Sequence, residues 1–117
     1  MATETTELSA PSITDVRRSN YMAALSLAEQ IMSETTVMPT DFKVTVYSFA
    51  PNDPEISFYF HRDVASLQQF AGERGLTVSV EPRETGSVYH EAAGQAVRGV
   101  RVTAWSLISN DEAAVAA

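Results

Sequence analysis

Apolar residues recur three and four positions apart near the start of the chain, and this spacing predicts a helix over about Ile13–Ser33. The residues that form its apolar stripe are Tyr21, Ala24, Leu25, Ala28, Ile31 and Met32. Ser12 is placed to cap the amino end, with Asp15 three residues further on, as in a capping box. Pro39 prevents a simple continuation of the helix because proline disrupts helix interiors.

Alternation of apolar and polar residues follows and predicts two strands. The first covers Phe42–Phe49 and the second covers Glu55–His61, while Ala50–Pro54 between them has the composition of a turn. Two alternating segments joined by a short turn are typical of a β-hairpin.

A second helix is predicted over about Asp63–Arg74, with Val64, Leu67, Phe70 and Ala71 on its apolar side. Gly75 stands where a left-handed residue can end a helix, and Leu76 can supply the apolar contact of a Schellman-type cap.

The last third of the chain alternates again. Leu76–Glu81 is predicted to be a strand and Pro82–Gly86 a turn. Ser87–Glu91 is either a short fourth strand or a loop, and Ala92–Ala96 has the character of a loop. Val100–Leu107 alternates and is predicted to be the final strand.

The predicted element order is α-β-β-α-β-β-β, or one strand fewer if the fourth segment is a loop. Hairpins with helices outside them favour an α+β two-layer sandwich, with a mostly antiparallel sheet of four or five strands and both helices on one face. The predicted core consists of Leu25, Ala28, Ile31, Val44, Val46, Ile56, Phe58, Phe60, Leu67, Phe70, Val78, Val80, Val100 and Val102.

The composition is consistent with a globular domain that can form such a core. The chain has 117 residues, of which 44% are hydrophobic and 20% charged, as in ordinary globular domains. We expect one domain over residues 12–109, a disordered tail over 1–11 and a frayed tail over 110–117, because these ends are polar or rich in alanine. The amino end has neither a basic start nor an apolar run, so a cytoplasmic location is expected.

Charge narrows the range of partners. The formal net charge is −7, and the part from Ile13 to Ser109 keeps eleven acidic residues against eight basic ones, a balance near −3. Binding to nucleic acid depends on a surplus of lysine and arginine that neutralises phosphates. An anionic membrane surface selects for the same surplus. We therefore expect neither nucleic acid nor a membrane as partner.

Few residues suggest catalysis. There is no cysteine, which excludes disulfides, thiol catalysis and cysteine-based zinc sites. The two histidines, His61 close to Asp63 and His90 beside Glu91, are weak signals, because a metal or acid–base site needs groups that converge. The sequence therefore predicts structural histidines, no catalytic residue, no metal ligand and no cofactor.

The polar phase of the strands is the strongest functional feature. It combines aromatic rings, hydroxyls and an arginine on Thr45, Tyr47, Phe49, Ser57, Tyr59, Thr77, Ser79, Arg101, Thr103 and Trp105, joined by Tyr89 if the fourth segment is a strand. Such residues suit strands and form cross-strand pairs without any further role. Tyrosine, tryptophan and arginine are also enriched at binding hot spots. Under this second interpretation the binding residues are Tyr47, Phe49, Tyr59, Arg101 and Trp105.

Three hypotheses about function follow. The first is a non-catalytic module that contacts another protein, or a second copy of itself, through the aromatic sheet face. The second is a small enzyme or ligand-binding protein with a site near His61 and His90. The third, supported only by the net charge, is an acidic inhibitor or mimic that acts on another protein.

Overall fold

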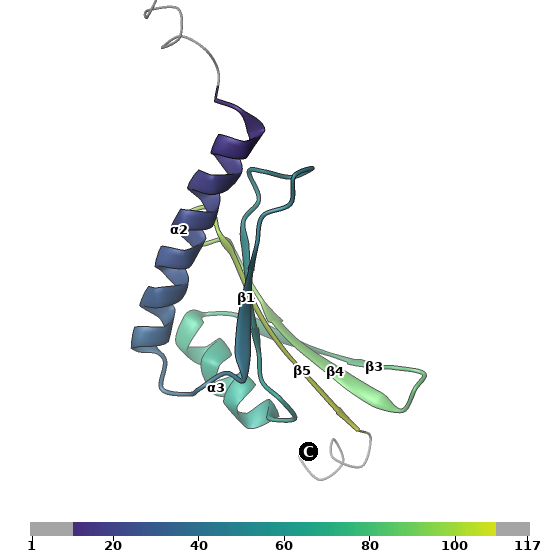
Figure 1. The fold of residues 1–117 in the computed structure, drawn as a ribbon. Coiled ribbons are helices and arrows are strands. Elements are labelled where there is room, and N and C mark those ends of the chain that lie inside the picture. The colour runs from purple at the N-terminus through teal and green to yellow at the C-terminus, as the bar shows by residue number, and fades with distance from the viewer. Residues whose placement is uncertain (1–10, 110–117) are drawn as a thin grey trace, which may run out of the picture.

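The computed structural model describes residues 11–109, which form two helices and one five-stranded sheet (Figure 1). The elements are α2 (Ile13–Glu34), β1 (Asp41–Thr45), β2 (Glu55–Tyr59), α3 (Val64–Arg74), β3 (Thr77–Pro82), β4 (Ser87–Ala93) and β5 (Arg101–Ser109). The predicted α+β class and the longer of the two predicted element orders are confirmed. The tail predictions for residues 1–10 and 110–117 lie outside the described residues.

The strand order is β1-β2-β5-β4-β3, so the last strand inserts beside the second. β2 and β5 are parallel, and the other three pairs are antiparallel. This arrangement follows from the position of α3, after which the chain enters the far edge as β3 and returns inward through β4 and β5. The sheet is therefore mixed but mostly antiparallel.

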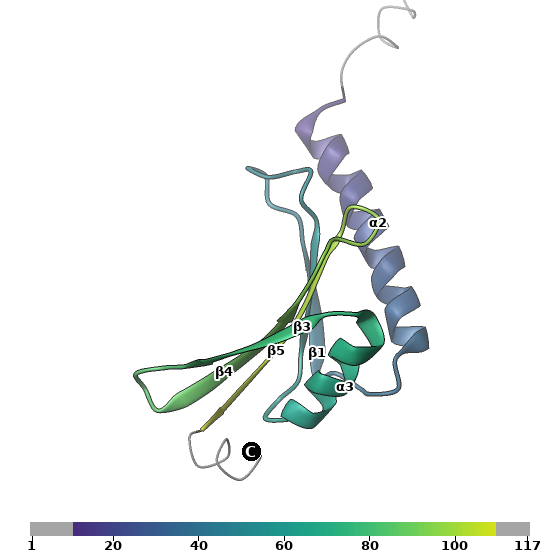
Figure 2. The same cartoon turned by 180° about the vertical axis from the view of Figure 1, so that it is seen from behind.

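Both helices lie on the same side of the sheet, as predicted (Figure 2). The buried cluster between the layers consists of Ala24, Leu27, Ala28, Ile31, Ile56, Phe58, Phe60, Leu67, Phe70, Ala71, Ala92, Val100, Val102 and Ala104. At its centre the ring of Phe70 lies 4.9 Å from that of Phe58 and 5.5 Å from that of Phe60, measured between centroids. Neither described helix is apolar enough along its length to cross a membrane.

The helix ends confirm the signals in the sequence. The Ser12 hydroxyl accepts a hydrogen bond from the Asp15 amide at 3.1 Å, so Ser12 caps α2. At the end of α3, Gly75 has φ of 68°, and the Leu76 amide donates to the Ala71 carbonyl at 2.9 Å. A left-handed residue at this position favours glycine because it has no Cβ.

The prediction that Leu25 and Val80 belong to the core is wrong. Leu25 is 46% exposed, and the buried stripe of α2 instead runs through Ala24, Leu27, Ala28 and Ile31. Leu25 and Leu27 lie on opposite sides of the line through Ala24, Ala28 and Ile31, so the sequence alone did not set the rotation of the helix. Val80 is 57% exposed because it belongs to the edge strand β3.

Several strand boundaries also differ from prediction, including the ends of β1 and β4. β1 ends at Thr45, and the Val46 carbonyl accepts bonds from Arg17 Nε at 3.1 Å and Nη2 at 2.9 Å instead of a strand neighbour. β4 extends to Ala93, through residues predicted to form a loop, because Ala92 pairs with β3 on one side and with Ala104 of β5 on the other.

Candidate binding face on the open side of the sheet

The sheet face opposite α2 and α3, here called the open face, contains a hollow of about 610 Å³. The end of the β3–β4 hairpin bends away from the helices, so the sheet is curved (Figures 1 and 2). Its lining comes from alternate residues of β1, β2, β4 and β5 together with Tyr47. These residues have the opposite parity to the buried core, so the hollow is built on the polar phase of the strands.

One cross-strand row forms the main wall of the hollow. Asp41 of β1 is in register with Tyr59 of β2, Tyr59 with Trp105 of β5, and Trp105 with Glu91 of β4. All four side chains line the hollow. Residues directly opposite one another on neighbouring strands have Cβ atoms roughly 4.5–5.5 Å apart. The sheet therefore places two aromatic residues between two carboxylates.

Three rings pack side by side in this wall and are here called the aromatic row: Tyr59, Trp105 and Tyr89. The Trp105 ring lies 4.3 Å from the Tyr59 ring and 6.1 Å from the Tyr89 ring, with tilts of 33° and 34°. The Tyr59 hydroxyl is 2.6 Å from Nδ1 of His61, just beyond the end of β2. Tilted rings at such separations attract one another, which favours this arrangement of the row.

The floor of the hollow is low because small residues follow the aromatic row. Ser57 of β2 and Thr103 of β5 are in register, and Lys43 of β1 continues their row to the edge of the sheet. Glu55 and Tyr47 line the hollow further along. Short side chains between larger ones leave space that the chain itself does not fill on this face.

The lining is negatively charged, with carboxylates at Asp41, Glu55 and Glu91 against the single ammonium group of Lys43. Tyr89 donates its hydroxyl hydrogen to Glu91 Oε2 at 3.2 Å, and the Arg83 guanidinium lies 4.6 Å from the centre of the Tyr89 ring. Burial raises the pKa of Tyr89, and the nearby charge of Glu91 raises it further.

The structure brings three of the five predicted binding residues together in the hollow. Tyr47, Tyr59 and Trp105 line the hollow. Phe49 is 82% exposed and stacks on Tyr47, with ring centroids 4.8 Å apart. Arg101 is exposed and in register with Glu55, but it does not line the hollow.

The carboxylates of the hollow were not among the binding residues predicted from the sequence. Glu91 belongs to it because β4 is a full strand whose parity carries Tyr89 and Glu91 to the same face. Asp41 belongs because β1 begins one residue earlier than predicted. The alternation around Tyr89 could have indicated that Glu91 shares its face. Alternation within one strand does not show which strands are neighbours in the sheet.

The two histidines do not form a shared site. His61 bonds to Tyr59 on the open face. His90 is buried on the opposite face of the sheet, with Val88 and Ala92 of the same strand. His90 is 8% exposed, and its Nδ1 has no hydrogen-bond partner. Within residues 11–109, no three His, Asp or Glu side chains are grouped to hold a metal ion.

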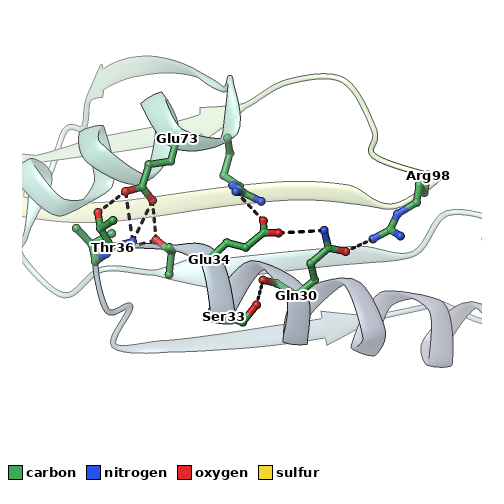
Figure 3. A network of polar contacts seen from close by, with 9 residues as sticks. Gln30, Ser33, Glu34, Thr36, Glu73 and Arg98 are labelled. Atoms are coloured by element: carbon green, nitrogen blue, oxygen red, sulfur yellow. Dashed lines mark hydrogen bonds and ion pairs between the residues drawn. The ribbon is translucent and has the colours of Figure 1, made fainter.

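A second polar cluster joins the ends of the two helices (Figure 3). The Glu73 carboxylate accepts hydrogen bonds from the Thr35 hydroxyl at 2.8 Å, from the Thr36 amide at 3.3 Å and from the Thr36 hydroxyl. These bonds, led by those from the two hydroxyls, lower the pKa of Glu73 to about 2. The donors come from this chain's own residues, which indicates a structural role.

The same cluster fastens the loop before β5. Arg98 Nη2 donates to Gln30 Oε1 at 2.7 Å, Gln30 Nε2 donates to Glu34 at 3.3 Å, and Arg74 Nη2 donates to Glu34 at 3.0 Å (Figure 3). Arg98 has φ of 51° in this loop. The loop over residues 94–99 is thereby tied to α2, on the helix side of the sheet.

Comparison with known proteins adds no relative from which a site could be transferred: no family model, no curated protein and no solved structure matches the chain.

Proposed function

We propose that this protein is a non-catalytic interaction module that binds a protein partner in the hollow of its open face. One observation carries the proposal: the aromatic row lies in a hollow on the sheet face that neither described helix covers. Aromatic residues with polar and charged groups around them resemble the centre and rim of a protein interface.

The apolar contact of the hollow is too small to drive binding by itself. If a partner removes roughly 100 Å² of apolar surface from water, counted on both molecules, at ~25 cal/mol/Å² this contributes about 2–3 kcal/mol. Association costs roughly 4–15 kcal/mol in lost freedom of motion. The aromatic row alone therefore does not offset the cost of association, and the polar contacts around it must supply the rest and decide which partner binds.

A site that uses both histidines gains no comparable support, because His61 and His90 lie on different sides of the sheet. His61 contacts the hollow only through its bond to Tyr59, at the exposed end of β2. The arrangement of rings, small residues and carboxylates favours recognition of a partner over a reaction at a histidine.

Selection from a random peptide library tests the proposal while the partner is still unidentified. Peptides selected on the wild-type protein should lose binding to a Tyr59→Ser/Trp105→Ser variant. They should retain binding to Met22→Ser/Leu25→Ser, which removes two exposed apolar side chains of α2 instead. Equal loss on both variants, or no loss on either, would contradict a role for the open face.

Sizing in solution separates a foreign partner from a second copy of the chain. Trp105 is the only tryptophan, so its fluorescence reports on the hollow directly. A stable monomer with red-shifted Trp105 emission leaves the face free for another protein. A dimer whose blue-shifted emission turns red on dilution identifies a second copy as the occupant. Blue-shifted emission in a strict monomer would show that Trp105 is internal and would remove the basis of the proposal.

A further inference from the structure

The charges around the aromatic row point to the chemistry of its partner. Asp41 and Glu91 stand at the two ends of the register that runs through Tyr59 and Trp105. Asp41 is exposed, and Glu91 is half-buried beside the rings. A group that sits over Tyr59 and Trp105 therefore meets a carboxylate on either side.

The aromatic row already holds one cation of this chain. The Arg83 guanidinium lies 4.6 Å from the centre of the Tyr89 ring, within the range of a cation–π contact. Tyr89 in turn donates its hydroxyl hydrogen to Glu91. A guanidinium over a ring whose hydroxyl bonds a carboxylate is thus an arrangement that this face supports.

The other charged residues around the hollow do not cancel its preference for a cationic group. Lys43 stands in the next row, in register with Ser57, and Glu55 adds a third carboxylate further along. The lining holds three carboxylates and one ammonium group. At its border the Arg101 guanidinium is in register with Glu55, and the Arg83 guanidinium lies over Tyr89. Glu81, in register with Tyr89, adds a carboxylate, so that carboxylates outnumber cationic groups by four to three, and the whole chain has a formal charge of −7. Complementary charge favours encounter with a basic partner and disfavours an acidic one.

We propose, building on the proposed function, that the occupant of the hollow is a basic peptide segment of a partner protein. An arginine or lysine side chain of this segment lies over Tyr59 and Trp105, with its charge between Asp41 and Glu91. The flat guanidinium of arginine stacks on rings and bonds carboxylates at the same time, so arginine fits better than lysine. The low floor at Ser57 and Thr103 takes the adjoining residues of the segment.

Calorimetric titration with a hexa-arginine peptide tests this inference, with hexa-citrulline as a control of the same shape without charge. Hexa-arginine should bind and change the fluorescence of Trp105, and hexa-citrulline should bind at least ~10-fold more weakly, since lost charge pairs and cation–π contacts add to about one factor of ten. Equal binding of the two peptides would overturn the inference.

Matched variants locate the binding. Asp41→Asn/Glu91→Gln should weaken hexa-arginine binding by roughly 3- to 10-fold, because two ion pairs of exposed or half-exposed groups are lost together. Asp15→Asn/Glu29→Gln changes the net charge equally but on α2, and it should weaken binding by less than ~2-fold because these charges are distant and screened. Equal weakening by both pairs would show attraction to net charge alone and would refute the site.

The library selection separates failure of this inference from failure of the proposed function. Selected peptides that need Tyr59 and Trp105 but lack arginine and lysine would refute a basic partner and leave the open face as a binding surface. A second copy of the chain in the hollow would likewise refute a basic peptide as the partner and leave the open face as a binding surface. Peptides that bind independently of Tyr59 and Trp105 would refute both.

Discussion

The two faces of the sheet differ in how far other parts of the chain cover their aromatic side chains. On the helix side, Phe58 and Phe60 pack against Phe70 of α3 and are fully buried. On the open face, Tyr59 comes between these two phenylalanines in sequence and packs against Trp105, yet both rings remain partly exposed. Adjacent residues on a strand thus serve the core and a surface at once, because strand parity sends them to opposite faces.

The polar groups of the two sides show the same contrast. On the helix side, Glu73 receives its hydrogen bonds from Thr35, Thr36 and Gln69 of the same chain. On the open face, Asp41 and Glu55 line a hollow instead of a packed junction between elements. A carboxylate bonded by donors of its own chain stabilises the fold, whereas one beside an unfilled hollow is placed to contact another molecule.

The largest effect should come from truncating an aromatic ring on each side. Phe58→Ala should lower the free energy of unfolding by roughly 3–5 kcal/mol, because a fully buried ring leaves a cavity. Trp105→Ala should cost clearly less, since its ring is only half-buried. Urea unfolding of both variants checks this. Equal losses would mean that Trp105 belongs to the core and that the contrast between the faces is false.

Adding a ring on each side should show the same contrast between the two faces. Ala104→Phe inserts bulk into the fully buried layer beside Phe58, and overpacking of this kind typically costs about 1–3 kcal/mol. Ser57→Phe fills the hollow instead, so the free energy of unfolding should change by less than ~0.5 kcal/mol, as for ordinary surface substitutions. Hexa-arginine binding to Ser57→Phe should fall. A variant at Ser57 that is as unstable as Ala104→Phe would show that the floor of the hollow is packed.

The smallest expected effect concerns acid stability on the helix side. The pKa of Glu73 is about 2 in the folded protein against an ordinary value of 4.5. A lowered pKa stabilises the fold above pH 4.5, and this contribution disappears as the pH falls from 4.5 towards 2. Because the carboxylate is near solvent, we expect a modest slope, reduced in Glu73→Gln.

Urea unfolding of wild type and Glu73→Gln across this pH range measures the slope. Thr36→Val, which removes one hydroxyl donor and keeps the shape, should give part of the same reduction. Identical slopes in the wild type and both variants would contradict the role of this network.

Local features of the sequence were sufficient for every element except β4, which they left open between a strand and a loop. The spacing of apolar residues identified α2 and α3, and alternation identified the other four strands, because both periodicities are properties of the backbone alone. Gly75 was recognisable as a helix end because only a residue without Cβ adopts its backbone angles easily. Parity along β2 and β5 also placed Tyr59 and Trp105 on one face before their strands were known to be neighbours.

Contacts between distant segments decided the rest. The sequence did not show that β2 and β5 pair in parallel, that β4 continues to Ala93, or that α2 buries Leu27 in place of Leu25. The hollow depends on the same contacts, since Asp41 and Glu91 are separated by about half of the domain in sequence and share a row only through the pairing of four strands. Periodicity fixes which way a side chain points relative to its own strand, but the identity of its neighbour depends on long-range pairing, and the candidate binding face is made of such neighbours.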